Sequence, residues 1–338
     1  MRSPTLFWGG ALAAFLILVA AAAPLLAPYD PAEQLDPSAA AYRPPGTKLA
    51  AVHLAAGGWR LADRVERTET GLVLTRRGRT EELPASGVLN LTPAGVADRR
   101  VFLLGSDKFG RDVLSRLLYG TRISLAVSVI SVLLALTLGV AVGSAAALGG
   151  PLVDTLLMRG VDALLSFPSL FLLIAIAALV DPGLWSMVVI LGSLSWTTIS
   201  RLIRAEILSL RNREFIVAAR ALGQHPLLIL WRHLLPNAFT PVLIQTVLLM
   251  GSLILAESSL SFLGLGIQPP TPSWGNMISE GREALSFAWW IAVFPGAAIA
   301  LAVIAWNLLG DGLRDALDPR SPDTGPLPGV PETPAGPP

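Results

Sequence analysis

Few side chains in this sequence could catalyse a reaction, and their spacing argues against an enzyme. The three histidines, His53, His225 and His233, lie outside the long apolar stretches, and no His-Glu-x-x-His zinc motif is present. The absence of cysteine excludes disulfides, thiolate metal sites and cysteine nucleophiles, and leaves the redox compartment open. Neither lysine, Lys48 or Lys108, follows the glycine that a phosphate-binding loop requires. We therefore predict no catalytic residue, no metal site and no bound cofactor; any ATP that powers this protein is hydrolysed by another chain.

Glu257 is an acidic side chain near the predicted outer end of a long apolar stretch, next to Ser258. Ionisable residues in such places are candidates for a function, so we predict that both residues belong to a translocation path or gate. The alternative for Glu257 is an interfacial carboxylate in contact with headgroup water. A proton- or sodium-coupled carrier should show broken helices or deeper charges, so one carboxylate is thin support for that class.

The segment Leu103–Leu125 carries several charged residues just ahead of an apolar stretch. Ser106 or Asp107 is predicted to cap a helix that lies along the outer membrane surface before it enters the membrane. A gate and a simple interfacial anchor are equally compatible with this pattern. The predicted polar side of the helix carries Arg111, Arg116 and Arg122, and the candidate gate residues are Asp107, Arg111 and Asp112.

The stretch Glu214–Asn237 has the pattern of two short helices between two apolar stretches. Gly223 suits a left-handed helix end, and Pro226 suits the first turn of a new helix, where no helical partner exists for the missing N–H. The small residues allow close approach of another surface, although an ordinary basic connecting loop is the alternative. The candidate contact residues are Glu214, Ala218, Ala219, Gly223, Leu235 and Pro236, and the predicted apolar stripe is Phe215, Ile216, Ala219, Leu222 and Leu230.

The composition places these candidates in an integral membrane protein. The chain of 338 residues is 53% hydrophobic and only 14% charged, whereas about a quarter of a soluble domain is charged. A net charge of +1 and scattered basic residues argue against nucleic acid as a partner. We predict an all-α polytopic fold with six transmembrane helices, Leu6–Leu26, Ile123–Leu148, Val161–Val180, Trp185–Leu202, Phe239–Phe262 and Trp289–Leu309.

The orientation and the bends of these helices follow from charge and proline. The basic loop 204–237 is predicted to be cytosolic by the positive-inside rule, and six spans then place both termini in the cytosol. A cleaved signal peptide is the alternative for the first stretch and would leave five spans. Pro168 and Pro295 are predicted kinks, either hinges or static bends. Gly139 and Gly143, four residues apart, favour close helix packing.

The outer region contains a predicted β-rich insert, because short runs rich in Val, Leu and Trp alternate there with glycine and proline signals. The predicted strands are Leu49–Leu54, Trp59–Val65, Leu72–Thr75 and Val88–Leu91. The predicted organisation is an N-terminal transmembrane helix (1–26), an extracytoplasmic segment (27–102) with the insert (46–98), a core of five transmembrane helices (103–320) that contains the cytosolic loop 204–237, and a disordered Pro/Gly-rich tail (321–338).

Several motifs together resemble the permease subunits of ABC importers, specifically the C-type permease of the dipeptide/oligopeptide (peptide/nickel) family. The matching stretches are the loop above and LLGSDKFGRDVLSRLLYGTRISL, VDALLSFPSLFLL, ESSLSFLGLGIQPPTPSWGNMI and NLLGDGLRDALDPR. The resemblance implies the type I importer fold in the bacterial inner membrane and short peptides as cargo. It also implies a homologous permease as heterodimer partner, two ATPase subunits that bind ATP and Mg, an extracytoplasmic substrate-binding protein, and loop 204–237 as the ATPase-coupling loop.

Two departures from the family leave questions open. The family's coupling loop begins Glu-Ala-Ala, but here Val217 replaces that Glu, and Glu214 lies one turn earlier on the same helical face. The insert is longer than the usual outer segment, and we hypothesise that it contacts the binding protein or covers the outer mouth. The alternatives are another cargo, such as nickel or a metal chelate, an opine or a glycoside, or an ATP-independent carrier, or a membrane enzyme.

Overall fold

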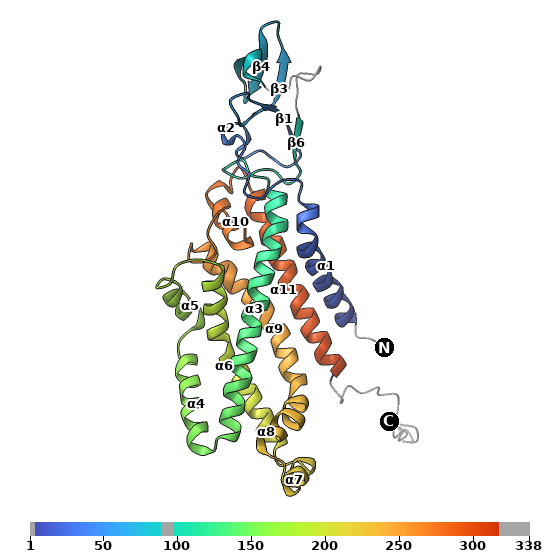
Figure 1. The fold of residues 1–338 in the computed structure, drawn as a ribbon, viewed down its shortest axis with the longest axis vertical. Helices are drawn as coiled ribbons and strands as arrows, with labels where there is room; N and C mark the ends of the chain where they lie inside the picture. Colours follow the sequence, from blue (N-terminus) through green and yellow to red (C-terminus); the bar gives the residue numbers. More distant parts are fainter. Residues whose placement is uncertain (1–3, 89–97, 318–338) are drawn as a thin grey trace, which may run out of the picture.

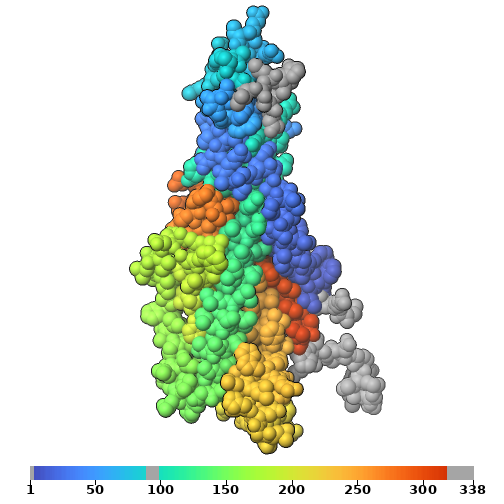
Figure 2. Space-filling view, in the orientation of Figure 1, coloured from blue at the N-terminus to red at the C-terminus, as the bar shows by residue number. Residues whose placement is uncertain are grey.

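A bundle of long helices carries a β-rich insert at one end and two short helices at the other (Figure 1). The computed structural model describes residues 4–88 and 98–317, so the predicted tail lies outside the described residues. The space-filling view shows the insert as a narrow extension of the bundle and the short helices as a projection at the opposite end (Figure 2).

Five single helices are long and apolar enough to span a membrane. They are α1 (Pro4–Leu26), α3 (Val113–Leu148), α6 (Leu184–Leu210), α9 (Leu235–Phe262) and α11 (Trp290–Leu317). The third predicted span is instead a bent pair, α4 (Pro151–Leu165) and α5 (Ser169–Ala177), whose axes differ by 85°. The described part of the chain therefore reaches six spans only if this pair counts as one.

The two predicted kinks have different outcomes. Pro168 lies at the break between α4 and α5, where its ring and missing N–H prevent the helix from continuing. Pro295 lies inside α11, which continues through it from Trp290 to Leu317. Only the first proline therefore interrupts a span.

Close packing of α3 against α6 depends on the two glycines singled out from the sequence. A Cβ atom at Gly139 would lie 2.6 Å from the Cβ of Ile199, and one at Gly143 would lie 2.5 Å from the carbonyl oxygen of Ser200. Real Cβ atoms are not found so close, so each glycine is needed for this helix separation. The predicted role of the small residues in helix packing is confirmed.

The predicted surface helix before the second span is wrong. Helix α3 runs unbroken for 36 residues, about 54 Å, and begins at Val113. Its cap is Asp112, whose side chain accepts the Ser115 backbone N–H, and neither Ser106 nor Asp107 caps it. The structure thus has one continuous helix where a surface helix followed by a span was predicted. Ser273 caps α10 (Trp274–Gly281) in a capping box with Asn276.

The short helices at the far end are α7 (Glu214–Ala221) and α8 (Pro226–Ile229), followed by a π-helical turn, Leu230–Leu234, that leads into α9. We call α7, α8 and this turn the knob. Buried side chains of the knob join a core cluster with α6 and α9, so the knob is fixed to two spans. Its remaining surface projects beyond the bundle (Figure 2).

The insert contains two antiparallel three-stranded sheets of order β2-β1-β6 and β3-β4-β5. A short helix, α2 (Pro37–Ala40), lies at its base, and a 3₁₀ turn, Ala85–Gly87, follows the fifth strand. The strands are β1 (Thr47–His53), β2 (Trp59–Ala62), β3 (Arg64–Arg67), β4 (Gly71–Arg76), β5 (Arg79–Pro84) and β6 (Asp98–Phe102).

Sequence patterns predicted part of this insert. The predicted strands at 49–54 and 72–75 correspond to β1 and β4, whereas the predicted strand at 59–65 is divided between β2 and β3. The fourth predicted strand, 88–91, lies almost wholly outside the described residues, and Val88 forms an isolated bridge with Leu54. Strands β5 and β6 were missed because their sequences, RTEELP and DRRVF, are mostly polar.

Candidate functional site

The two short helices of the knob meet at a left-handed glycine. Gly223 has φ +74°, its N–H donates to the Arg220 carbonyl at 2.9 Å, and the Gln224 N–H donates to the Ala219 carbonyl at 3.2 Å. This hydrogen-bonding pattern is that of a helix C-terminus closed by glycine. Pro226 then starts α8, as predicted, so the turn geometry expected from the sequence is confirmed.

The knob has one apolar face turned toward the bundle and another left uncovered. Ile216, Ala219 and Leu230 are buried in the cluster that includes α6. Phe215 and Leu222, which complete the predicted stripe, are instead 44% and 80% exposed. The predicted stripe is therefore wrong as a single surface, because it is divided between the two faces. The large uncovered apolar side chains are Phe215, Val217, Leu222, Leu227, Leu228 and Trp231.

The six candidate contact residues are divided in the same way. Ala219 is buried and Leu235 is half-buried, whereas Glu214, Ala218, Gly223 and Pro236 are exposed. Glu214 is the first residue of α7, and Val217, one turn later, is also exposed. A partner that contacts α7 would therefore meet an acidic side chain followed by an apolar one.

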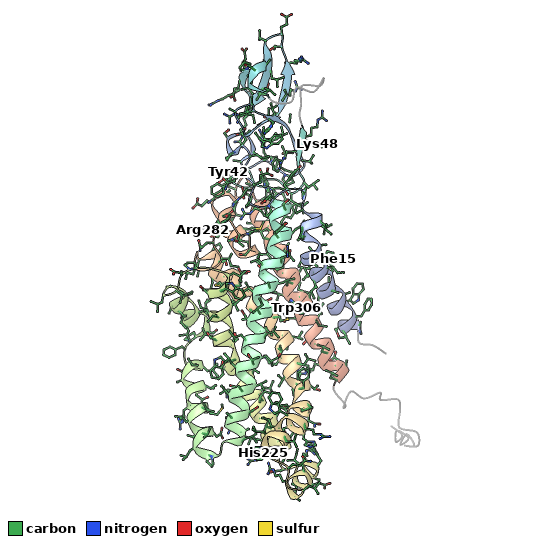
Figure 3. All side chains as sticks on the ribbon, in the orientation of Figure 1. Phe15, Tyr42, Lys48, His225, Arg282 and Trp306 are labelled. Carbon is green, nitrogen blue, oxygen red and sulfur yellow. The ribbon has the colours of Figure 1, made fainter. Side chains whose placement is uncertain are left out.

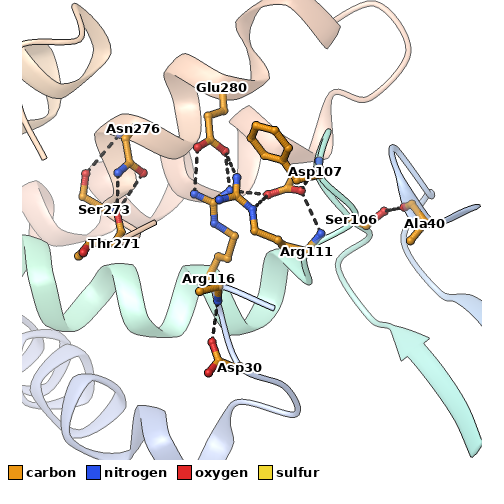
Figure 4. A network of polar contacts seen from close by, with 12 residues as sticks. Asp30, Ala40, Ser106, Asp107, Arg111, Arg116, Thr271, Ser273, Asn276 and Glu280 are labelled. Carbon is orange, nitrogen blue, oxygen red and sulfur yellow. Dashed lines mark hydrogen bonds and ion pairs between the residues drawn. The ribbon is translucent and has the colours of Figure 1, made fainter. Parts of the chain in front are cut away.

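At the insert end, four charged side chains form an internal cluster that we call the polar node (Figure 4). Asp107 accepts from Arg111 Nε at 2.6 Å and is also paired with Arg116. Glu280 of α10 accepts from Arg111 Nη2 at 2.6 Å and Arg116 Nη1 at 2.5 Å. Arg111 and Arg116 are each 1% exposed, so their predicted place on a polar, water-facing side is wrong.

The polar node joins the insert to the bundle. The Asp107 carbonyl accepts the Tyr42 N–H at 3.0 Å, and the Ser106 hydroxyl accepts the Arg43 N–H at 2.8 Å. The indole N–H of Trp290, at the start of α11, donates to the Ser106 carbonyl at 3.1 Å. The base of the insert, α3, α10 and α11 therefore meet around one short segment.

Asp112 is a structural cap beside the node. Its carboxylate accepts both the N–H and the hydroxyl of Ser115, at 2.7 and 2.8 Å. Burial raises the pKa of Asp112, although the two bonds from Ser115 oppose the rise. The geometry thus assigns Asp112 to the N-terminal cap of α3.

Glu257 of α9 is enclosed by serine hydroxyls and has 0% exposure. It accepts from Ser261 at 2.8 Å, from Ser124 of α3 at 3.2 Å and from Ser258 at 3.4 Å. The Ser124 hydroxyl in turn accepts the Trp274 N–H at 3.3 Å. The alternative of a carboxylate in contact with headgroup water is therefore wrong, because protein groups surround it completely.

The helical core of this chain matches a known family of transport proteins. The family described as "Binding-protein-dependent transport system inner membrane component" matches residues 117–321, more than half of the chain. The chain belongs to this family. The N-terminal transmembrane domain of oligopeptide transport permease C also matches residues 1–45. The chain is thus a multi-pass membrane permease, with the permease fold expected from the resemblance and a small β-rich insert.

Named relatives of this permease agree with the family match. The di/tripeptide transport system permease protein DppC of Pseudomonas aeruginosa is 43% identical over 219 residues, which cover 65% of this chain and 72% of that protein. A candidate peptide permease of Brucella ovis is 45% identical over 221 residues, 64% of this chain and 72% of its own. An inward-facing MetNI methionine ABC transporter aligns over 58% of this chain and 95% of its own, with 18% identity and a TM-score of 0.46.

Sequence reasoning missed two parts of the site in this permease. Glu280 was not singled out, although it supplies half of the negative charge of the polar node. The serines around Glu257 were also missed, apart from Ser258. Ser261 lies one turn after Glu257 in the same helix, a spacing that could have predicted their hydrogen bond. Ser124 and Glu280 carried no such signal, because both are distant in sequence from their partners.

Proposed function

We propose that this permease forms half of the translocation path of an ATP-driven importer of short peptides. A homologous permease supplies the other half, a substrate-binding protein delivers the peptide, and two ATPase subunits bind ATP and Mg. The permease itself is non-catalytic and lies in the bacterial inner membrane with both termini in the cytosol. The peptide names of its relatives in Pseudomonas and Brucella support this cargo over a metal chelate, an opine or a glycoside.

The uncovered apolar face of the knob is the observation that carries this proposal. Leu222 at the end of α7 is 80% exposed and Leu227 of α8 is 58% exposed, on the projection opposite the insert (Figure 1). An exposed apolar patch marks a contact with another protein or with a membrane surface, and we propose a protein contact for this projection. The knob is the ATPase-coupling loop in this account, and its exposed candidate residues, Glu214, Ala218 and Gly223, lie at the contact.

The knob packs firmly against two spans, so it can transmit motion to them. Its inner side chains, Ile216 and Leu230, pack in the same cluster as Ile203 and Ile207 of α6. The π-helical turn leads directly into α9, so no flexible linker separates the knob from that span. Motion of a docked ATPase would therefore displace α6 and α9 together, which opens or closes the path between the two permeases.

Reconstitution tests the proposal. The permease is placed in liposomes alone, and then with its homologous permease, ATPases and binding protein, and uptake of a labelled dipeptide is measured. The proposal expects uptake only from the complete set with ATP. Uptake by the permease alone would contradict it and favour a secondary carrier, for which the break between α4 and α5 is the one supporting observation.

The insert is proposed to contact the binding protein or to cover the outer mouth. The N–H of Gly46 donates to the carbonyl of Phe102 at 2.8 Å, so the two ends of the insert lie side by side. A short Gly-Ser linker can therefore replace residues 47–101 without pulling on the polar node. Reduced uptake or weaker docking of the binding protein is expected, and unchanged values for both would show that the insert has no such role.

A further inference from the structure

An apolar groove runs along the side of α3 that is turned toward the knob. Its volume is about 750 Å³, and a second cavity of about 320 Å³ continues it, because Leu136, Val140, Trp231 and Leu235 line both. The walls come from α3, the start of α4, α8, the π-helical turn and α9. Most of the lining side chains are apolar, so the groove suits an apolar ligand.

The groove lies at the end of the membrane spans. The continuous stretch Pro226–Phe262, which includes α8 and α9, is long and apolar enough to be one span. Leu136, Val140 and Leu148 recur along one side of α3 and cover about 18 Å of its length. Trp231 is 68% exposed, and an aromatic side chain in such a place is typical of the membrane interface. The groove therefore leads from the hydrocarbon toward the headgroup level.

One polar group in the groove wall has no partner. Ser144 of α3 is 5% exposed, and its hydroxyl forms no hydrogen bond with any residue that the structure describes. A buried hydroxyl of this kind costs free energy unless a ligand or a water molecule satisfies it. Ser144 lies one turn before the end of α3 at Leu148, so it is placed to donate to a lipid ester carbonyl near the interface.

The rim of the groove is positively charged. Arg232 follows Trp231 in the π-helical turn, is exposed, and pairs with no acidic group that the structure describes. Near the α4 wall, Arg211 is exposed and acts electrostatically on Asp154 in the first turn of α4. The loop 204–237 carries five arginines and two glutamates. Basic groups at this level attract anionic lipid headgroups.

We propose that this groove binds one anionic phospholipid of the cytosolic leaflet. An acyl chain lies between α3 and the knob, the Ser144 hydroxyl donates to an ester carbonyl, and Arg232 holds the phosphate. The uncovered face of the knob is thereby divided, because Leu227 borders the groove whereas Val217 and Leu222 do not. The choice of leaflet rests on the cytosolic placement of the knob proposed above, but lipid binding needs no ATPase contact.

Lipid binding to the purified complex tests the proposal. Native mass spectrometry counts bound phosphatidylglycerol and phosphatidylcholine molecules that carry identical acyl chains. We expect at least about fivefold tighter binding of phosphatidylglycerol, because one arginine near the surface contributes about that factor. Arg232→Gln should remove most of this preference without weakening phosphatidylcholine binding, and Arg232→Lys should keep it.

A second variant obstructs the acyl chain. Ala141 is exposed in the groove wall, so Ala141→Trp should fill the groove from the surface and weaken the binding of both lipids. The matched control is Leu133→Trp, two turns earlier on α3, where the side chain is 54% exposed and does not line the groove. This control should bind both lipids as the unmodified permease does.

Photo-cross-linking identifies the occupant of the groove. In vesicles that contain both lipids, benzoylphenylalanine in place of Thr137, an exposed residue of the groove wall, should form adducts mainly with phosphatidylglycerol. The same group in place of Phe15 is the control, because this α1 side chain is 54% exposed and points away from the bundle (Figure 3). Position 15 should sample the two lipids without preference.

The inference is overturned if the two lipids bind equally, or if Ala141→Trp binds phosphatidylglycerol as tightly as Leu133→Trp does. It is also overturned if position 137 forms adducts only with another subunit, which would show that a protein helix fills the groove. Cross-linking of Val217→Cys to the ATPase tests the proposed function separately. If that cross-link forms while the lipid site fails, only this inference falls.

Discussion

The polar node and the knob lie at opposite ends of the molecule and differ in whether their side chains are buried or exposed. In the node, two carboxylates and two guanidinium groups are buried and paired with one another. In the knob, large apolar side chains such as Leu222 remain exposed. The chain pairs the buried charges at one end by itself and leaves large apolar side chains uncovered at the other.

The difference has an energetic consequence for motion. Removing one partner of a buried ion pair leaves an uncompensated charge, so the node resists opening. The knob, in contrast, gains free energy only when another protein covers it, at about 25 cal/mol per Å² of apolar surface. We therefore expect the node to act as a fixed joint between insert and bundle, and the knob to be the end at which motion enters.

The largest expected effect comes from breaking the node. Asp107→Ala leaves Arg111 and Arg116 to share Glu280, and should destabilise the complex by about 3–5 kcal/mol. Thermal unfolding of the purified complex in detergent measures the change. The control is Glu66→Ala on exposed strand β3, expected to stay within about 0.5 kcal/mol. Similar unfolding of both variants would show that the node does not hold the ends together.

The next largest effect is expected from Gly223→Leu, which should impair the function of the knob without preventing insertion of the spans. Gly223→Leu should abolish peptide uptake while the spans still insert, because a left-handed conformation costs a non-glycine residue about 1–2 kcal/mol and the added side chain obstructs a docked partner. A Cβ at this position meets nothing within 4 Å in this chain, so an additional clash must come from a partner.

Gly223→Asn is the matched control for that variant, since asparagine tolerates the left-handed region and is much smaller. It should retain most uptake and should still co-purify with the ATPases. Normal uptake by Gly223→Leu would contradict the coupling role of the knob.

Sequence reasoning succeeded where a property is local and failed where it depends on distant partners. The left-handed Gly223, the helix start at Pro226 and the close packing at Gly139 each follow from one residue and its neighbours. The burial of Arg116 does not, because it depends on Glu280, 164 residues away. An arginine in an amphipathic pattern is predicted to face water unless its buried partner is known.

A smaller effect concerns the exposed face of the knob. Leu222→Ser should leave thermal stability almost unchanged, because the side chain is 80% exposed. It should weaken ATPase binding by about 1 kcal/mol or more if the residue lies in the contact. Titration of labelled ATPase onto the reconstituted permeases measures this change. A variant that loses stability but binds normally would reverse the assignment of the two faces.

The smallest expected effect comes from removing the exposed ion pair between Arg43 and Asp63 in the insert, in contrast to the buried node. Desolvation opposes the shift, but the Arg77 N–H and the Arg43 side chain lower the pKa of Asp63. The contribution of Asp63 to the stability of the insert is therefore fully present above its unfolded pKa, about 3.9. It is lost as the pH falls through the lower pKa of the folded state.

Because Asp63 is about one-third exposed, screening limits its contribution, and Asp63→Asn should cost under about 1 kcal/mol at neutral pH. Hydrogen exchange of the β4 amides measures the loss, which should disappear in acid. A loss as large as that of Asp107→Ala would remove the distinction between exposed and buried pairs.

Cross-linking from position 217 tests the central claim most directly. Val217 is 53% exposed on α7, and Val217→Cys would be the only thiol in the chain. In intact cells this thiol should be protected from an impermeant reagent, and in the assembled complex a short bifunctional linker should join it to an ATPase subunit. Labelling from outside the cell, or the absence of any ATPase adduct, would contradict the claim that the knob couples ATP hydrolysis to transport.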